Sequence, residues 1–195
     1  MLFLVFVLAN TEVYAQSKKQ GNGCIKCDEF EVGEAFELDG FTYTVADRKM
    51  LDEALEKGED LTKYCTSKVT DMSGMFQFWN FFNQDIGNWD VSNVTDMSAM
   101  FFDARPFNQD IGNWDVSNVT YMSGMFRYAS SFNQDIGSWD VSNVTDMKEI
   151  FSYASFFNQD LTQWCVSKIP SIPYDFSKGS GLTQANKPVW GTCPP

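Results

Sequence analysis

Four aspartates that recur every 25 residues are the first candidates for chemistry in this sequence, because carboxylate oxygens bind calcium and can act in pairs as acid and base. They are Asp85, Asp110, Asp135 and Asp160. If neighbouring copies lay about 4.8 Å apart, their carboxylates would repel by about 3.5 kcal/mol at an effective dielectric of about 20. We expect solvent and turn N–H groups to relieve this repulsion. Calcium is the weaker alternative, since no EF-hand loop or glycine–aspartate nonapeptide is present.

Catalysis by these carboxylates is disfavoured by their regularity. A glycosidase uses one pair of carboxylates about 5–9 Å apart, whereas here every aspartate recurs in register and no unique pair stands out. The sequence also contains no histidine, which excludes Ser-His-Asp and Cys-His catalysis and histidine-ligated zinc. We therefore predict a protein without enzymatic activity or cofactor, and without a metal site beyond the weak calcium alternative.

The first residues and the net charge indicate an exported protein. Residues 1–15 are apolar, too short to span a bilayer, and end in a small-residue pattern, so we predict a signal peptide followed by a flexible segment at 16–34. The net charge of −12 disfavours nucleic acid and anionic membranes as partners. We expect a secreted or cell-surface protein whose mature chain does not insert into a membrane.

Five cysteines in an exported chain predict disulfide bonds, with one thiol left over. Cys65 and Cys165 occupy the same place in the repeat, where interior units have aspartate. Four spacings of about 4.8 Å would separate them by about 19 Å, which is too far for a bond between them. We predict that Cys165 pairs with Cys193, and that Cys65 pairs with Cys24 or Cys27.

The elements that must position these residues recur with the same period. The motif Phe-Asn-Gln-Asp begins at residues 82, 107, 132 and 157, and no insertion separates the copies. A strict short period predicts a solenoid in which each unit buries its apolar surface against the next. Within one unit, residues 94–97 suit a short strand, residues 98–104 suit about two helical turns, and residues 107–118 suit a return strand. We place the repeats at residues 64–169.

Different sequences flank the repeats and are expected to cap their ends. Residues 35–63 predict a β-hairpin with an Asp39-Gly40 turn, followed by a helix with Asp47 as its N-cap and Gly58 as its stop. Residues 170–195 lose the period and gain proline and glycine, so we predict an irregular C-terminal cap. Its expected apolar plugs are Phe176, Leu182, Val189 and Trp190.

Two further columns favour a structural role over recognition. The tryptophans would either form an exposed ladder that stacks on sugar rings or lie buried with the indole N–H bonded to a carbonyl, and we favour burial because tryptophan buries a large area. The asparagines are expected to form an internal hydrogen-bonded ladder between units. The two columns are Trp89, Trp114, Trp139 and Trp164, and Asn83, Asn108, Asn133 and Asn158.

Residues that differ between units within a constant frame are the better guide to a ligand. The stretch before each Phe-Asn-Gln-Asp motif varies in size and charge from unit to unit. Solvent-facing drift would give the same variation, so recognition and drift stand on equal terms. The candidate ligand-binding residues are Trp79, Arg105, Arg127, Tyr128 and Tyr153.

The repeat also carries a family resemblance. Its units read FNQDIGxWDVSNVTDMSxMF, with V-T-D-M and M-F-x-x-A-x-x-F in phase through residues 64–169. This pattern resembles the BspA-like leucine-rich-repeat surface proteins. The resemblance implies a leucine-rich-repeat-like α/β fold, a stack of short parallel strands and short helical turns, and exposure outside the cell.

The resemblance further implies recognition of, or adhesion to, an extracellular protein or glycan rather than catalysis. Two other functions stay open. One is a purely structural spacer in a surface layer. The other, less favoured, is a secreted glycan-active enzyme that uses aspartate pairs.

Overall fold

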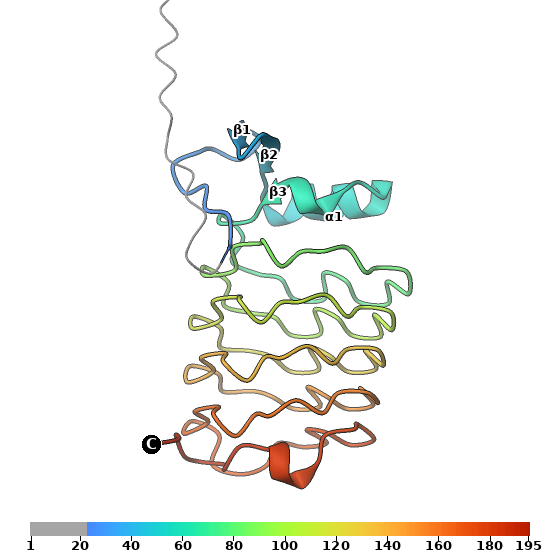
Figure 1. Ribbon diagram of the computed structural model, residues 1–195, viewed down its shortest axis with the longest axis vertical. Coiled ribbons are helices and arrows are strands. Elements are labelled where there is room, and N and C mark those ends of the chain that lie inside the picture. Colours follow the sequence, from blue (N-terminus) through green and yellow to red (C-terminus); the bar gives the residue numbers. More distant parts are fainter. Residues whose placement is uncertain (1–22) are drawn as a thin grey trace, which may run out of the picture.

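The computed structural model describes residues 23–195, and the predicted signal peptide at 1–15 lies outside them, as do residues 16–22. All the regular elements but one lie near the N-terminal end of the described chain, and the last, η2, lies at its C-terminal end (Figure 1). In chain order they are β1 (Ala35–Leu38), β2 (Phe41–Val45), α1 (Arg48–Lys57), η1 (Leu61–Lys63), β3 (Tyr64–Cys65) and η2 (Gln184–Asn186).

The hairpin β1–β2 forms where the sequence predicts it. Asp39 and Gly40 both have positive φ, 53° and 81°, as a type I′ turn requires. Phe36 pairs with Tyr43 across the two antiparallel strands, and their rings lie 5.8 Å apart. β3 then joins β2 in parallel, so the small mixed sheet has the order β1-β2-β3.

Helix α1 follows from its capping residues. The Asp47 side chain accepts a hydrogen bond from the Met50 N–H at 2.9 Å, and Gly58 ends the helix with a left-handed φ of 70°. Leu51, Ala54 and Leu55 are buried in the main core. The helix therefore covers the N-terminal end of the repeats with these three side chains.

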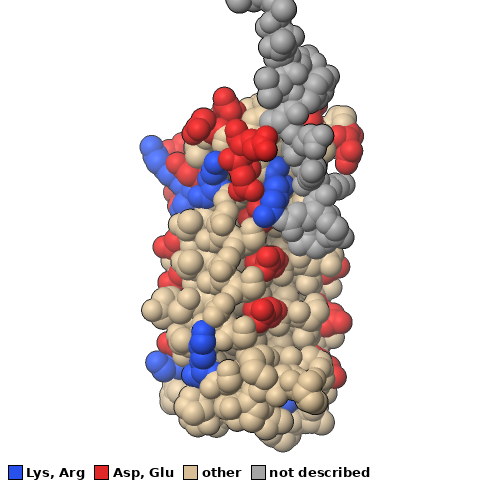
Figure 2. All heavy atoms as spheres, turned by 90° about the vertical axis from the view of Figure 1, so that its left-hand side faces the viewer, with Lys and Arg blue, Asp and Glu red and all other residues tan. Residues whose placement is uncertain are grey.

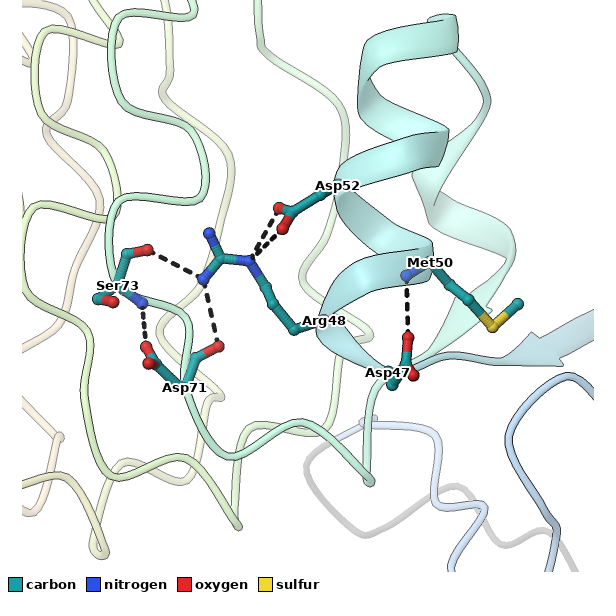
Figure 3. Close-up of polar contacts among 6 residues, drawn as sticks. All are labelled: Asp47, Arg48, Met50, Asp52, Asp71 and Ser73. Carbon is teal, nitrogen blue, oxygen red and sulfur yellow. Dashed lines mark hydrogen bonds and ion pairs between the residues drawn. The ribbon is translucent and has the colours of Figure 1, made fainter.

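Arg48 ties α1 to the first repeat unit (Figure 3). Its Nε donates to both carboxylate oxygens of Asp52, at 2.8 and 3.0 Å, within the helix. Its Nη1 donates to the backbone carbonyls of Ser73 at 2.9 Å and Asp71 at 3.3 Å. One guanidinium thus links the helix to a turn 25 residues further along the chain.

The predicted leucine-rich-repeat-like α/β solenoid is wrong. Within residues 23–195 there is one α-helix, one small three-stranded sheet and two 3-10 segments, and the strand, helix and return strand expected in each unit are absent. The repeat region is built of turns instead, with single parallel bridges between consecutive units. These bridges join Asp71 to Asp96, Asp96 to Tyr121 and Tyr121 to Asp146.

The expected helix fails because backbone N–H groups alternate between two kinds of partner. The N–H groups of Ala99 and Phe101 donate to carbonyls of the next unit at 2.8 and 2.9 Å, whereas Met100 between them donates three residues back at 3.2 Å. Ala99 also has a left-handed φ of 54°, which an α-helix does not accommodate. Apolar residues at helical spacing are therefore buried by a run of turns, and half of the hydrogen bonds join units rather than closing a helix.

The core consists of like residues from successive units in contact with one another. Phe101 lies 3.9 Å from Phe107 within its unit and 5.5 Å from Phe126 in the next, measured between ring centroids. Both pairings recur in the neighbouring units. Burying such a side chain stabilises the fold by about 1.5–3 kcal/mol. The conserved phase of the phenylalanines thus follows from their mutual packing.

The C-terminal segment covers the last unit, but not all of the apolar residues expected to be buried there are buried. Phe176 and Leu182 are buried, and Trp190 packs edge-on against Phe176 at 4.8 Å. Val189, an expected plug, is instead 69% exposed, and its neighbours Pro188 and Trp190 face the protein. A disulfide bond joins Cys165 to Cys193 in this segment.

Candidate recognition surface

The aspartate column serves the turns of the repeat. Each of these exposed carboxylates accepts a hydrogen bond from the N–H two residues further on, as Asp85 does from Gly87 at 3.1 Å and Asp160 from Thr162 at 2.9 Å. That bond lowers the pKa of Asp160. Asp110 and Asp135 bind Gly112 and Gly137 in the same way. No three His, Cys, Asp or Glu residues of the described chain are grouped to hold a metal ion.

The tryptophan column is buried. Trp114 is 3% exposed, and its indole Nε1 donates to the carbonyl of Ile86 in the preceding unit at 3.2 Å. The same bond recurs for Trp89, Trp139 and Trp164, with lengths from 2.9 to 3.2 Å. These indoles therefore offer no face to a sugar ring and instead join units.

The asparagine column forms a ladder, but at the surface rather than inside. Asn83 accepts the N–H of Asn108 on its Oδ1 at 3.0 Å, and Asn108 accepts that of Asn133 at 2.9 Å. Asn133 and Asn158 continue the series, which ends at Thr183. The ladder can form at the surface because each asparagine oxygen accepts a backbone N–H of the next unit, and this bond does not require the side chain to be buried.

A glutamine column completes this ladder and was not expected from the sequence. Gln109 Nε2 donates to the backbone carbonyl of Asn83 at 3.0 Å, and Gln134 does the same for Asn108 at 2.7 Å. The signal was present, since a glutamine follows the asparagine in every Phe-Asn-Gln-Asp motif. The glutamine column is therefore structural, like the three columns above. The variable stretches are the remaining candidates for recognition.

The cysteines lie at the two ends of the repeats. Cys65 is bonded to Cys27, which settles the alternative left by the sequence. Cys24 keeps its thiol in a buried position, with Sγ 3.8 Å from the carbonyl of Asn113. Burial, with a smaller contribution from Asp90 and Asp115, raises the pKa of this thiol to about 11.

The structure brings together three of the five candidate ligand-binding residues. Arg127, Tyr128 and Tyr153 lie in contact, whereas Arg105 is exposed and pairs with Asp103 at 2.7 Å. Trp79 is half-buried against the main core. The variable stretches therefore supply one continuous group and two outlying residues.

Two phenylalanines extend this group across four units. Phe78 and Phe102 meet edge to face at 5.1 Å, Phe102 and Tyr128 at 5.9 Å, and Tyr128 lies parallel to Tyr153 at 4.8 Å. We call these residues, with Arg127, the aromatic row. Both phenylalanines lie within the variable stretches, so their variation was a signal that could have found them.

Arg127 supplies the charge of the aromatic row. Its guanidinium carbon lies 5.4 Å from the Phe102 ring centroid and 5.2 Å from that of Tyr128, within cation–π range. Its Nη1 binds Glu149 at 2.6 Å. Partial burial lowers the pKa of Arg127, but Tyr128 and Glu149 outweigh burial and raise it overall. The Nε of Arg127 has no hydrogen-bond partner among the described residues.

Three of the five residues of the aromatic row lie on left-handed backbone. Phe78, Tyr128 and Tyr153 have left-handed φ values of 65°, 60° and 60°, which cost a residue with a Cβ about 1–2 kcal/mol each. At the other left-handed position of the repeat two units have glycine, Gly74 and Gly124, and two have Ala99 and Glu149. Left-handed backbone therefore recurs through the repeat, and at the position of Phe78, Tyr128 and Tyr153 three of four units place an aromatic ring on it.

One side of the molecule is sparsely charged away from its ends (Figure 2). Figure 2 shows one side of the molecule as mostly uncharged, with acidic groups at intervals and basic groups near its two ends. No helix within residues 23–195 has both the length and the apolar character needed to cross a bilayer.

These features define a protein of 25-residue units built from turns, with structural columns and one variable aromatic surface. The chain belongs to the family described as "Mycoplasma protein of unknown function, DUF285", which matches residues 46–164 and 109–191. No curated protein and no solved structure was found to match it.

Proposed function

We propose that this protein is a non-enzymatic recognition or adhesion module, secreted or held at the cell surface, that binds an extracellular protein or glycan through the aromatic row. The observation that carries the proposal is the continuity of the row. Phe78, Phe102, Tyr128 and Tyr153 touch in sequence across four units, with Arg127 against two of them.

The chemistry of the aromatic row suits binding. Tyrosine and arginine are enriched at the residues that carry most binding energy, because they combine a large apolar surface with hydrogen-bonding groups. Phe78 is 59% exposed and Tyr153 is 39% exposed, so two of the rings are open to a partner.

The family supports the proposed location. It is associated with BspA-like surface repeat proteins, and we propose that this chain is likewise exposed outside the cell. Exposure outside the cell also agrees with the two disulfide bonds, which form and persist in oxidising surroundings.

A structural spacer is the second candidate, and the columns of the repeat favour it. Tryptophan, asparagine, glutamine and aspartate are all used to bind neighbouring turns or units. A spacer needs these contacts but has no need of a row of partly exposed rings. A glycan-active enzyme is favoured less, since each recurring aspartate uses an oxygen to close its own turn.

Capture of partners by the immobilised protein tests the proposal. Asparagine tolerates left-handed backbone, so replacing both Tyr128 and Tyr153 with Asn removes the rings while preserving the turns. We expect wild type to capture a host surface protein or glycan and the double variant to lose at least tenfold in affinity. Phe41→Ser is the control, since Phe41 is an exposed aromatic on β2. Equal capture by the double variant and wild type would leave only the spacer function.

A further inference from the structure

Three residues depart from the repeat at positions that lie close together in space. Tyr121 stands where three other units have aspartate, and Lys148 stands where three others have serine. Lys168 stands where the three interior units have asparagine, although the first unit also has a lysine there, Lys68. All three line one open groove of about 510 Å³ beside the last repeat units. Departures that are scattered along 48 residues of sequence therefore converge on one surface.

Tyr121 is not explained by the turn that holds it. In the other units the aspartate at this position accepts the N–H two residues further on, at 2.8 Å for Asp71 and Asp96 and 3.0 Å for Asp146. A phenol at the end of a rigid ring cannot make that short-range bond. The turn at Tyr121 thus forgoes a capping bond that its equivalents make, and the residue gained is a ring that is 49% exposed. A local rule broken without structural gain points to function.

The groove presents flat rings and positive charge. Tyr174 is 67% exposed on the side formed by the C-terminal segment, and Ile172 beside it is 55% exposed. Lys148 Nζ lies 3.3 Å from Asp146 Oδ2, and Lys168 Nζ donates to Asn143 Oδ1 at 2.7 Å. Each ammonium has three N–H donors, so both keep donors for a ligand.

The charge of the groove is opposite to that of the whole chain. Two lysines and one aspartate line it, whereas the chain carries a net charge of −12. Basic side chains near the C-terminal end of the molecule are also visible low in Figure 2. An anionic ligand would be drawn to this part of the surface and kept from most of the rest.

We propose that this groove binds a carboxylate-bearing sugar residue of an extracellular glycan. The sugar ring lies against Tyr121 or Tyr174, whose electron-rich faces attract its C–H groups, and the carboxylate accepts hydrogen bonds from Lys148 and Lys168. Two exposed rings beside an open groove suit the broad face of a sugar better than a narrow peptide side chain. The site is separate from the aromatic row and rests on the proposed function only for its extracellular setting.

Isothermal titration of the whole protein with trigalacturonate tests the site, with the fully methyl-esterified trisaccharide as a neutral counterpart. The variants Tyr121→Asp, Lys148→Ser and Lys168→Asn each introduce the residue that other units already carry, so all three should fold. We expect each lysine variant to weaken trigalacturonate binding about tenfold and the triple variant to abolish it. The methyl ester should bind at least tenfold more weakly than the acid. Lys49→Ser, on the exposed face of α1, is the charge-matched control and should bind as wild type does.

Three results would overturn the proposal. They are absence of trigalacturonate binding by the wild-type protein, unchanged binding by the folded triple variant, and equally tight binding of a pentaglutamate peptide, which would assign the groove to acidic peptides. Failure here is distinguishable from failure of the aromatic row, because the Asn variants at Tyr128 and Tyr153 leave the groove intact. Circular dichroism and the unfolding midpoint of each variant show that a loss of binding is not a loss of fold.

Discussion

At the scale of single residues, the side chains that hold the repeat together recur in every unit, whereas those of the two proposed sites differ from unit to unit. Trp114 has its ring buried and its N–H bonded to Ile86, and Asn108 donates its backbone N–H to Asn83 Oδ1 and accepts that of Asn133 on its own Oδ1. The side chains of Tyr128 and Tyr121 take no part in hydrogen bonds that recur in every unit. Each of them exposes part of its ring. Repetition therefore marks structure, and departure from repetition marks the candidate sites.

Replacing Trp114 with Phe should destabilise the protein by about 1–3 kcal/mol, because the Ile86 carbonyl loses its buried donor. Urea unfolding followed by circular dichroism measures this change. Phe81→Leu, at a residue that is 97% exposed, is the control and should stay within about 0.5 kcal/mol of wild type. A Trp114→Phe protein as stable as wild type would show that the indole bond contributes nothing.

Cys24 should make the protein less stable in alkaline solution. Burial raises its pKa from the ordinary value of 9.0 to about 11, so the fold favours the neutral thiol. This contribution is complete below pH 9 and is lost as the pH rises through 11, because the unfolded thiol ionises first. We expect the urea midpoint to fall between pH 9 and 11 in wild type.

The Cys24→Ala variant should show a shallower fall over the same range. Some decline will persist, because the hydrogen bond from Tyr64 to Glu59 raises the pKa of that phenol to about 12. Midpoints that decline in parallel for the two proteins would remove Cys24 as the cause.

At the scale of elements, the sequence predicts the N-terminal cap well and the inside of the repeat poorly. The hairpin and α1 carry their own local signals in Asp39-Gly40, Asp47 and Gly58, and each signal has one structural meaning. The pattern at residues 98–104 is compatible with two structures, because a helix and a run of turns both bury the same apolar residues. Only hydrogen bonds to the next unit decide between them, and those partners lie about 25 residues away.

The candidate surface was predictable to a similar degree. Variation between units found Arg127, Tyr128 and Tyr153, but the contacts that make them one row depend on turn geometry. The groove at Tyr121 was not found, since its walls come from two units and the C-terminal segment, whose approach no local pattern encodes.

Removing the guanidinium of Arg48 should loosen α1 from the first unit. Arg48→Ala loses bonds to Asp52 and to the carbonyls of Ser73 and Asp71, and we expect a loss of about 1–2 kcal/mol in the free energy of unfolding. Hydrogen exchange of the α1 amides should rise more than that of the later units. Lys49→Ala, on the same helix but paired only with Glu53 at 3.6 Å, is the control. Uniform exchange changes along the whole chain would contradict a local tie.

At the scale of the whole molecule, the protein is a constant frame that carries two variable surfaces. Contacts between identical residues hold the units together, the disulfide bonds Cys27–Cys65 and Cys165–Cys193 lie at the two ends, and helix α1 and the C-terminal segment cover those ends. The aromatic row and the groove at Tyr121 occupy positions where the frame tolerates change. Our proposals therefore assign folding and recognition to different residues of one repeat.

The most direct test of this division compares two variants at equal folded fraction. Partner capture is measured for the Trp114→Phe protein and for the Tyr128→Asn/Tyr153→Asn protein. Our account predicts that the tryptophan variant unfolds at lower urea yet captures its partner as wild type does. The tyrosine variant should unfold near the wild-type midpoint and fail to capture. The opposite pattern, with capture lost through the buried indole and kept without the two tyrosines, would contradict it.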